Sequence, residues 1–116
     1  MKSLPFLTIS DKKLTKNERK EARDRIDNYY RKKLSELQRY VYEAFEKYYA
    51  GKLTEFDLDH IIHIYHKQSQ ELFSFITSFD SNKDLPFILE YIKSEENGER
   101  VWQPRIQQKR EDKNGS

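Results

Sequence analysis

The chain has no cysteine, and only three glycines, three prolines and one tryptophan among its 116 residues. The lack of cysteine excludes disulfides, thiolate metal sites and a cysteine nucleophile. With so few glycines, the sequence contains no Gly-rich phosphate-binding loop. No apolar run approaches the roughly 20 residues that a membrane-spanning helix needs, and the N-terminal stretch lacks the apolar region of a signal peptide. We therefore expect a cytoplasmic protein that does not enter a membrane.

Hydrophobic residues make up only 35% of the chain, whereas charged residues make up 36%. Such a balance is typical of a helical protein with a large surface. Eight tyrosines and seven phenylalanines supply much of the apolar content. Because a tyrosine ring can pack while its hydroxyl reaches water, this composition predicts a thin core with a wide amphipathic border.

The most informative stretch is 54–79, where apolar or small residues recur in alternating steps of four and three. These positions are Leu58, Ile62, Tyr65, Ser69, Leu72, Ile76 and Phe79. This spacing is a heptad seam, which predicts a helix that lies along another helix.

A second helix with a matching seam is predicted over 15–50. Thr15 and Glu18 have the spacing of a capping box, and Gly51 suits the left-handed position that follows a helix. The seam positions are Tyr30, Leu34, Leu37, Val41, Ala44 and Tyr48. The two seams predict that these helices pack against each other.

The connection between the two helices is predicted to be short. Thr54 and Asp57 form a second capping box, and Leu53 and Leu58 have the spacing of a hydrophobic staple. A short connection produces antiparallel neighbours, so we expect a helical hairpin. Its register would place Leu37 near Tyr65.

A third, shorter helix is predicted over 84–96 and should pack on the open end of the hairpin. We expect Asp84 to cap it, Pro86 to lie in its first turn, and Asn97-Gly98 to end it. The predicted fold is therefore all-α, a small bundle formed by a long antiparallel hairpin and a third helix. Its parts are an N-terminal arm over 1–14, a helical domain over 15–96 and a polar tail over 97–116, which we expect to be disordered from about Gln107 onward.

The helix over 54–79 carries more apolar residues than one partner helix covers, since Ile61, Ile64, Phe73 and Phe75 lie beside or away from the seam. Either the arm and Trp102 cover this excess, or a second copy of the chain does. Trp102 would then anchor the tail or insert into a partner. We assign the protein contacts to four residues, which are Tyr42, Tyr49, Ile64 and Trp102.

All three histidines, His60, His63 and His66, lie on the 54–79 helix. Neighbours three residues apart can share a ligand, which makes His63 and His66 the candidates for a metal site. However, the helix lacks both the Glu-x-x-His repeat of di-iron bundles and the His-Glu-x-x-His of zinc peptidases. We therefore interpret two of them as surface residues and His66 as half-buried, and we expect no bound metal or other cofactor.

Between Asp11 and Arg39 the basic residues outnumber the acidic ones. A basic helix could bind phosphates, and the residues for this alternative are Lys16, Arg19, Lys20, Arg23, Arg31, Lys32 and Lys33. Acidic residues are interleaved at spacings of three and four, the pattern of a salt-bridged surface, so nucleic-acid binding is the second hypothesis.

No pattern in the sequence indicates nucleophilic or acid–base catalysis, and we expect that the protein is not an enzyme. The favoured hypothesis is a small non-catalytic helical interaction module that associates with a protein partner, possibly with a second copy of itself as a homodimer. A metal-binding bundle that uses the histidines is the third hypothesis.

Overall fold

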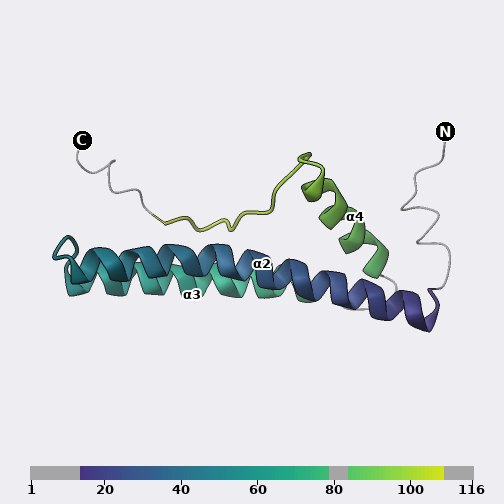
Figure 1. Cartoon of the computed structure of the whole chain (residues 1–116), viewed down its shortest axis with the longest axis horizontal. Coiled ribbons are helices and arrows are strands. Elements are labelled where there is room, and N and C mark those ends of the chain that lie inside the picture. Colours follow the sequence, from purple (N-terminus) through teal and green to yellow (C-terminus); the bar gives the residue numbers. More distant parts are fainter. Residues whose placement is uncertain (1–13, 79–83, 109–116) are drawn as a thin grey trace. The chain divides into compact units, whose positions relative to one another are not determined.

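The computed structural model describes residues 14–78 and 84–108, and within them the chain forms three helices. They are α2 (Lys16–Tyr49), α3 (Glu55–Thr77) and α4 (Leu85–Glu96), shown in Figure 1. The predicted all-α fold is confirmed. Phe79, nearly all of the predicted arm and the last eight residues of the predicted tail lie outside the described residues.

Both ends of α2 follow from local sequence. The Thr15 hydroxyl accepts a hydrogen bond from the Glu18 N–H at 3.1 Å, and the Glu18 carboxylate accepts one from the Thr15 N–H at 2.8 Å. At the other end Gly51 has a φ of 79°, its N–H bonds to the Tyr48 carbonyl, and the next N–H bonds to the Lys47 carbonyl. This pair of bonds is the Schellman motif, which satisfies carbonyls that the helix leaves without a partner.

The start of α3 repeats the reciprocal capping box. The Thr54 hydroxyl accepts from the Asp57 N–H at 3.1 Å, and the Asp57 carboxylate accepts from the Thr54 N–H at 2.9 Å. The prediction that Asp can take the usual place of Glu in this box is confirmed. Because caps close both sides of the connection, the turn between α2 and α3 is short.

The start of α4 differs from the prediction. Asp84 occupies the cap position but has an αR backbone, and its side chain makes no capping hydrogen bond. The Asp84 carbonyl instead accepts from the Phe87 N–H at 3.0 Å. Pro86 lies in the first turn as expected, and Gly98, with a φ of 79°, forms a second Schellman motif.

The described residues divide into two compact units, and both α2 and α3 contribute to each of them. Unit 2 contains residues 33–72 and 104–108. Here α2 and α3 form the antiparallel hairpin (Figure 1), in which the Gln38 amide donates to the Tyr65 hydroxyl at 3.3 Å. This bond agrees with the predicted register, which places Leu37 next to Tyr65.

The buried side of α3 is rotated toward Ile64 and Gln68 relative to the predicted seam. Ile62 is 37% exposed, whereas Ile64 is only 8% exposed and Gln68 only 4%. The prediction placed Ile62 in the seam and left Ile64 and Gln68 out of it, so the most buried side of α3 differs from the predicted one. The reason is that a further segment, residues 104–108, lies against the Ile64 side of α3.

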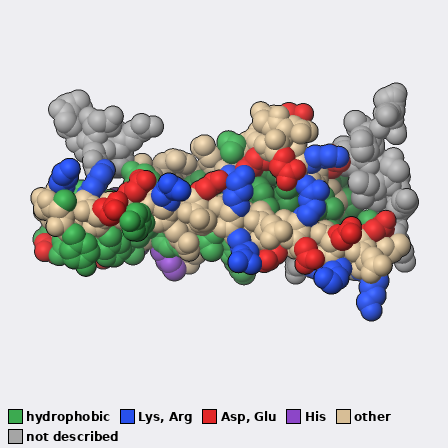
Figure 2. Space-filling view, in the orientation of Figure 1, with side chains coloured by type: hydrophobic (Ala, Val, Ile, Leu, Met, Phe, Trp, Pro, Cys, Tyr) green, Lys and Arg blue, Asp and Glu red, His purple; other side chains and the backbone are tan. Residues whose placement is uncertain are grey.

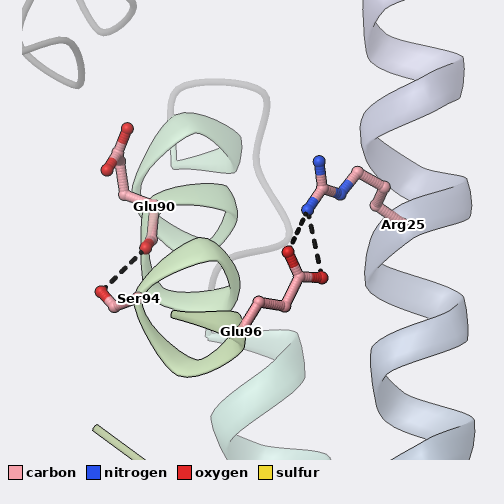
Figure 3. A network of polar contacts seen from close by, with 4 residues as sticks. All are labelled: Arg25, Glu90, Ser94 and Glu96. Carbon is pink, nitrogen blue, oxygen red and sulfur yellow. Dashed lines mark hydrogen bonds and ion pairs between the residues drawn. The ribbon is translucent and has the colours of Figure 1, made fainter. Parts of the chain in front are cut away.

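Unit 1 contains residues 14–32 and 73–103, without 79–83. Its buried apolar residues come from three helices and are Ala22, Tyr29, Ile76, Leu85, Pro86, Ile88 and Ile92. Arg25 of α2 reaches both carboxylate oxygens of Glu96 on α4 at 3.1 and 3.3 Å, as Figure 3 shows. The figure also shows Ser94, whose hydroxyl donates to the Glu90 carbonyl at 3.1 Å within α4. Packing of α4 on the helix ends remote from the turn confirms the predicted place of the third helix.

Candidate functional site

Exposed aromatic side chains gather in unit 2 where α2 turns into α3. Tyr42 is 63% exposed, Tyr49 is 79% exposed and Phe56, in the first turn of α3, is 85% exposed. Figure 2 shows the hydrophobic side chains collected near this turn. We call Tyr42, Phe45, Tyr49 and Phe56 the turn surface. Exposed aromatic side chains that gather in one region mark interaction sites more often than isolated ones do.

Ring contacts hold part of the turn surface in place. Tyr49 stacks on Phe45 with ring centroids 6.3 Å apart, and it meets the edge of Tyr48 at 5.1 Å. The Tyr48 hydroxyl in turn donates to the Glu55 carboxylate at 3.1 Å. These contacts restrict the rings before any partner binds, which lowers the entropy lost on association.

Nearby carboxylates change the acidity of two tyrosines. A hydrogen bond to Glu55, together with the negative charge of that carboxylate, raises the pKa of Tyr48 above its ordinary value. Glu46 raises the pKa of Tyr42 in the same way, first through a hydrogen bond and then through its charge. Both hydroxyls therefore keep their protons, and their bonds to these carboxylates, to higher pH than an ordinary tyrosine does.

Ile64 and Trp102, which were also assigned to protein contacts, pack within the chain and leave little surface for a partner. Ile64 is buried, so it offers a partner almost no surface. In unit 1, half-buried Trp102 stacks on Phe75 with ring centroids 5.8 Å apart, and the backbone N–H of Trp102 donates to the Glu95 carboxylate at 3.0 Å. Trp102 was predicted either to anchor the tail or to insert into a partner. Its packing on Phe75 agrees with an anchor of the tail.

Residues 104–108, which we call the strap, explain why Ile64 is buried. The Gln68 amide donates to the Ile106 carbonyl at 3.1 Å, and the Gln108 amide donates to the Ile61 carbonyl at 2.9 Å. Ile64 lies between Ile61 and Gln68 on the same side of α3. These bonds place the strap over that side of α3, and Gln108, which makes one of them, belongs to the stretch for which disorder was predicted.

Sequence reasoning missed Gln68 and Glu71 as contact residues of the strap. The Glu71 carboxylate accepts from the Arg105 N–H at 2.6 Å. A signal was present, because Gln68 lies four residues from both Ile64 and Leu72, within an apolar stripe. A polar residue in such a stripe needs a hydrogen-bond partner once it is buried.

The basic stretch of α2 is only partly available to an anionic ligand. Lys33 is 5% exposed, with its amine 3.5 Å from the Glu36 carboxylate. Lys20 and Arg31 pair with acids four residues away, at 3.4 and 3.8 Å. Arg19 donates to the Leu14 carbonyl at 2.8 Å. Lys16, Arg23 and Lys32 are exposed. This arrangement agrees with a salt-bridged surface and removes Lys33 from the nucleic-acid hypothesis.

The histidines do not come together with other ligands. His60, His63 and His66 are all exposed, so the interpretation of His66 as half-buried is wrong. Among residues 14–78 and 84–108, no group of three or more His, Asp or Glu side chains is placed to hold a metal ion.

Unit 1 has a shallow cavity of about 250 Å³. Its lining residues are Arg25, Asn28, Tyr29, Lys32, Ile92, Glu95 and Glu96. Both of its carboxylates already have partners, because Glu96 binds Arg25, and Glu95 accepts from the Tyr29 hydroxyl and the Trp102 N–H. The carboxylates that line the cavity are therefore engaged in contacts within unit 1.

The described part of the chain contains no helix with the length and apolar character needed to cross a bilayer. A comparison of the chain with protein-family models, with curated proteins and with solved structures found no match.

Proposed function

We propose that this chain is a small non-catalytic cytoplasmic interaction module that self-associates through the turn surface. The observation that carries the proposal is the exposure of three large aromatic side chains, Tyr42, Tyr49 and Phe56, at one end of unit 2. Large aromatic residues are the side chains most often responsible for binding energy at protein interfaces.

The spacing of these residues favours a helix as the partner. Tyr42, Phe45 and Tyr49 follow one another in steps of three and four, which makes a short second seam on α2. The first seam of α2, at positions such as Val41, Ala44 and Tyr48, already faces α3. A second seam of two turns can pack against one more helix whose apolar residues recur at the same steps of three and four.

A second copy of the chain meets this requirement. In a two-fold arrangement each copy presents the same surface, so Tyr42 of one copy faces Tyr49 of the other across the axis. Because aromatic side chains bury about 150–250 Å² each, Tyr42, Tyr49 and Phe56 would contribute roughly 450 Å² per copy. A pair would then bury roughly 900 Å² from these residues alone, close to the lower limit of about 1,000 Å² for a specific interface. Phe45 and the partly exposed Ile62 would add to it.

Light scattering or sedimentation over a range of concentrations tests the proposal. We expect the mass of the wild-type protein to rise from one copy to two, and Tyr49→Glu to shift the midpoint to at least tenfold higher concentration. The reason is that the substitution buries a carboxylate among aromatic side chains of the interface, which is strongly unfavourable.

Phe73→Glu is the matched control, because Phe73 is also an exposed aromatic residue of a long helix but belongs to unit 1. It should leave the midpoint unchanged. A wild-type protein that remains a single copy at millimolar concentration would exclude self-association. A salt-sensitive complex with mixed oligonucleotides would instead favour the basic residues of α2.

A further inference from the structure

We propose that the arm of the chain docks on unit 1, with Leu7 and Ile9 seated in an apolar groove between α2, α3 and the start of α4. The two residues lie outside the described residues, whereas the groove lies within them. The proposal goes beyond self-association and does not rest on it, because the turn surface belongs to unit 2 and the groove to unit 1.

The groove is a small cavity of about 170 Å³ with an apolar interior. Its lining residues are Arg23, Ile26, Asp27, Tyr30, Ile76, Thr77 and Leu85. Ile76 and Leu85 are buried, and Ile26 and Tyr30 are half-buried, whereas the two charged residues are exposed. Pockets for drug-sized ligands have volumes of about 300–1,000 Å³, so a groove of this size suits one or two aliphatic side chains better than a cofactor.

The start of α2 directs the arm toward this groove. The Arg19 guanidinium donates a hydrogen bond of 2.8 Å to the carbonyl of Leu14, the last residue of the arm. Arg19, Arg23 and Ile26 follow one another in steps of four and three, so they share one side of α2. The bond therefore holds the end of the arm on the side of α2 that carries the groove.

The length of the arm matches the distance to the groove. From Leu14 to Ile26 the rise along α2 is about 18 Å, at 1.5 Å per residue. An extended chain advances about 3.3 Å per residue, so about five residues of the arm cover nearly the same distance. An arm that runs back along α2 in extended form thus brings Ile9 level with Ile26, and Leu7 level with Tyr30.

The sequence of the arm suits an extended occupant. Leu7 and Ile9 are separated by one residue, and alternate side chains of an extended segment point to the same side. Thr8 between them then points away from the groove. Thr8 and Ile9 are both β-branched, which favours the extended conformation. Burial of two aliphatic side chains supplies the driving force for ordering the arm.

A spin label on the arm of the full chain tests where it lies. The chain has no cysteine, so Ser10→Cys carries a single nitroxide next to Ile9. In protein labelled with nitrogen-15, we expect the amide signals of Ile26, Tyr30 and Thr77 to lose at least half of their intensity relative to the reduced label. Full intensity at these three residues would overturn the proposal.

In the labelled chain Ile9→Asp should restore these signals, because a carboxylate is unfavourable inside an apolar groove. Thr8→Asp is the matched control, since it adds the same charge at the neighbouring position that points away, and it should leave the attenuation unchanged. If circular dichroism shows that Ile9→Asp does not fold, Ile9→Ser replaces it. Equal restoration by the Thr8 and Ile9 variants contradicts the seating of Ile9 in the groove.

A mixture of copies distinguishes docking within one chain from docking between chains. Copies that carry nitrogen-15 but no nitroxide are mixed with an equal amount of copies that carry the nitroxide alone. The signals of Ile26, Tyr30 and Thr77 should then keep their intensity. Attenuation in the mixture as strong as in the singly labelled protein overturns the proposal, because the groove would then hold the arm of a second copy.

Discussion

The hydroxyl of Tyr29 on α2 donates a hydrogen bond of 2.8 Å to the carboxylate of Glu95 on α4. The same carboxylate oxygen accepts a hydrogen bond from the backbone N–H of Trp102 at 3.0 Å. One oxygen atom therefore links α2, α4 and the start of the tail in unit 1. Tyr29 is buried, and a charged acceptor makes such a bond stronger than a neutral one does. This carboxylate therefore fixes how α4 and the following residues pack on α2.

Tyr29→Phe should lower the free energy of unfolding by about 1–2 kcal/mol, because the ring is kept while the hydrogen bond to Glu95 is lost. Denaturant unfolding measures this change. Tyr30→Phe removes a hydroxyl from the next position of the same helix and should change the free energy by less than about 0.5 kcal/mol. Equal effects of the two substitutions would show that the Tyr29–Glu95 bond does not contribute to stability.

Thr54→Ala should destabilise the protein by about 1 kcal/mol, because it removes the acceptor for the Asp57 N–H at the start of α3. Thr54→Ser keeps the hydroxyl and should restore most of the loss. Thermal unfolding followed by circular dichroism compares the three proteins. Ser35→Ala, at an exposed position within α2, is the control and should be neutral or slightly stabilising. A Thr54→Ser variant as unstable as Thr54→Ala would argue against the capping box.

Gly51→Ala should cost about 1–2 kcal/mol, since its φ of 79° is unfavourable for a residue with a Cβ atom. Apart from Gly51 and its two chain neighbours, no residue has an atom within 4 Å of the position that a Cβ would take, so the cost comes from the backbone and not from a clash. Gly51→Asn should be less harmful, because asparagine tolerates the left-handed region better. Unfolding measurements that rank alanine above asparagine in stability would contradict this explanation.

The Tyr48 hydroxyl should titrate above the ordinary value of about 10, because Glu55 raises its pKa. A pKa raised in the folded state means that the folded protein keeps this proton after the unfolded chain has begun to lose it. The contribution of the Tyr48–Glu55 bond to stability is therefore complete below about pH 10 and is lost as the pH rises through the pKa of the folded state.

Glu55→Gln should lower the pKa of Tyr48, which ultraviolet absorbance of tyrosinate can follow as the pH is raised. The same substitution in a Tyr48→Phe background should leave the remaining titration curve unchanged. A shift that persists in that background would mean that Glu55 acts on another tyrosine.

The extent to which this fold could be predicted depends on the range of the interactions involved. Both capping boxes, at Thr15 and Thr54, join residues three positions apart, and Gly51 ends α2 through bonds to carbonyls three and five positions back. Short spacings of this kind are visible in the sequence. The predicted cap at Asp84 is an exception. Asp is a suitable residue type, but a capping residue needs a non-helical backbone, and the backbone of Asp84 is αR.

The candidate sites were less predictable. Tyr42 and Tyr49 were identified because they lie off the first seam of α2, and both are exposed. Ile64 was assigned to a partner by the same reasoning and proved to be covered. Periodicity shows that a helix has an apolar flank, but it does not show which other segment of the chain covers that flank.

The three helices, most of their ends and the antiparallel hairpin could be predicted from the amino-acid sequence, because heptad spacing and capping act between residues that are close along the chain. The burial of Ile64 and Gln68 beneath the strap, and the exposure of Tyr49 and Phe56, follow from tertiary contacts. The contacts responsible join Gln68 to Ile106 and Ile61 to Gln108, residues far apart in sequence. No local pattern encodes such a pairing, since it depends on where the chain passes after α4 ends.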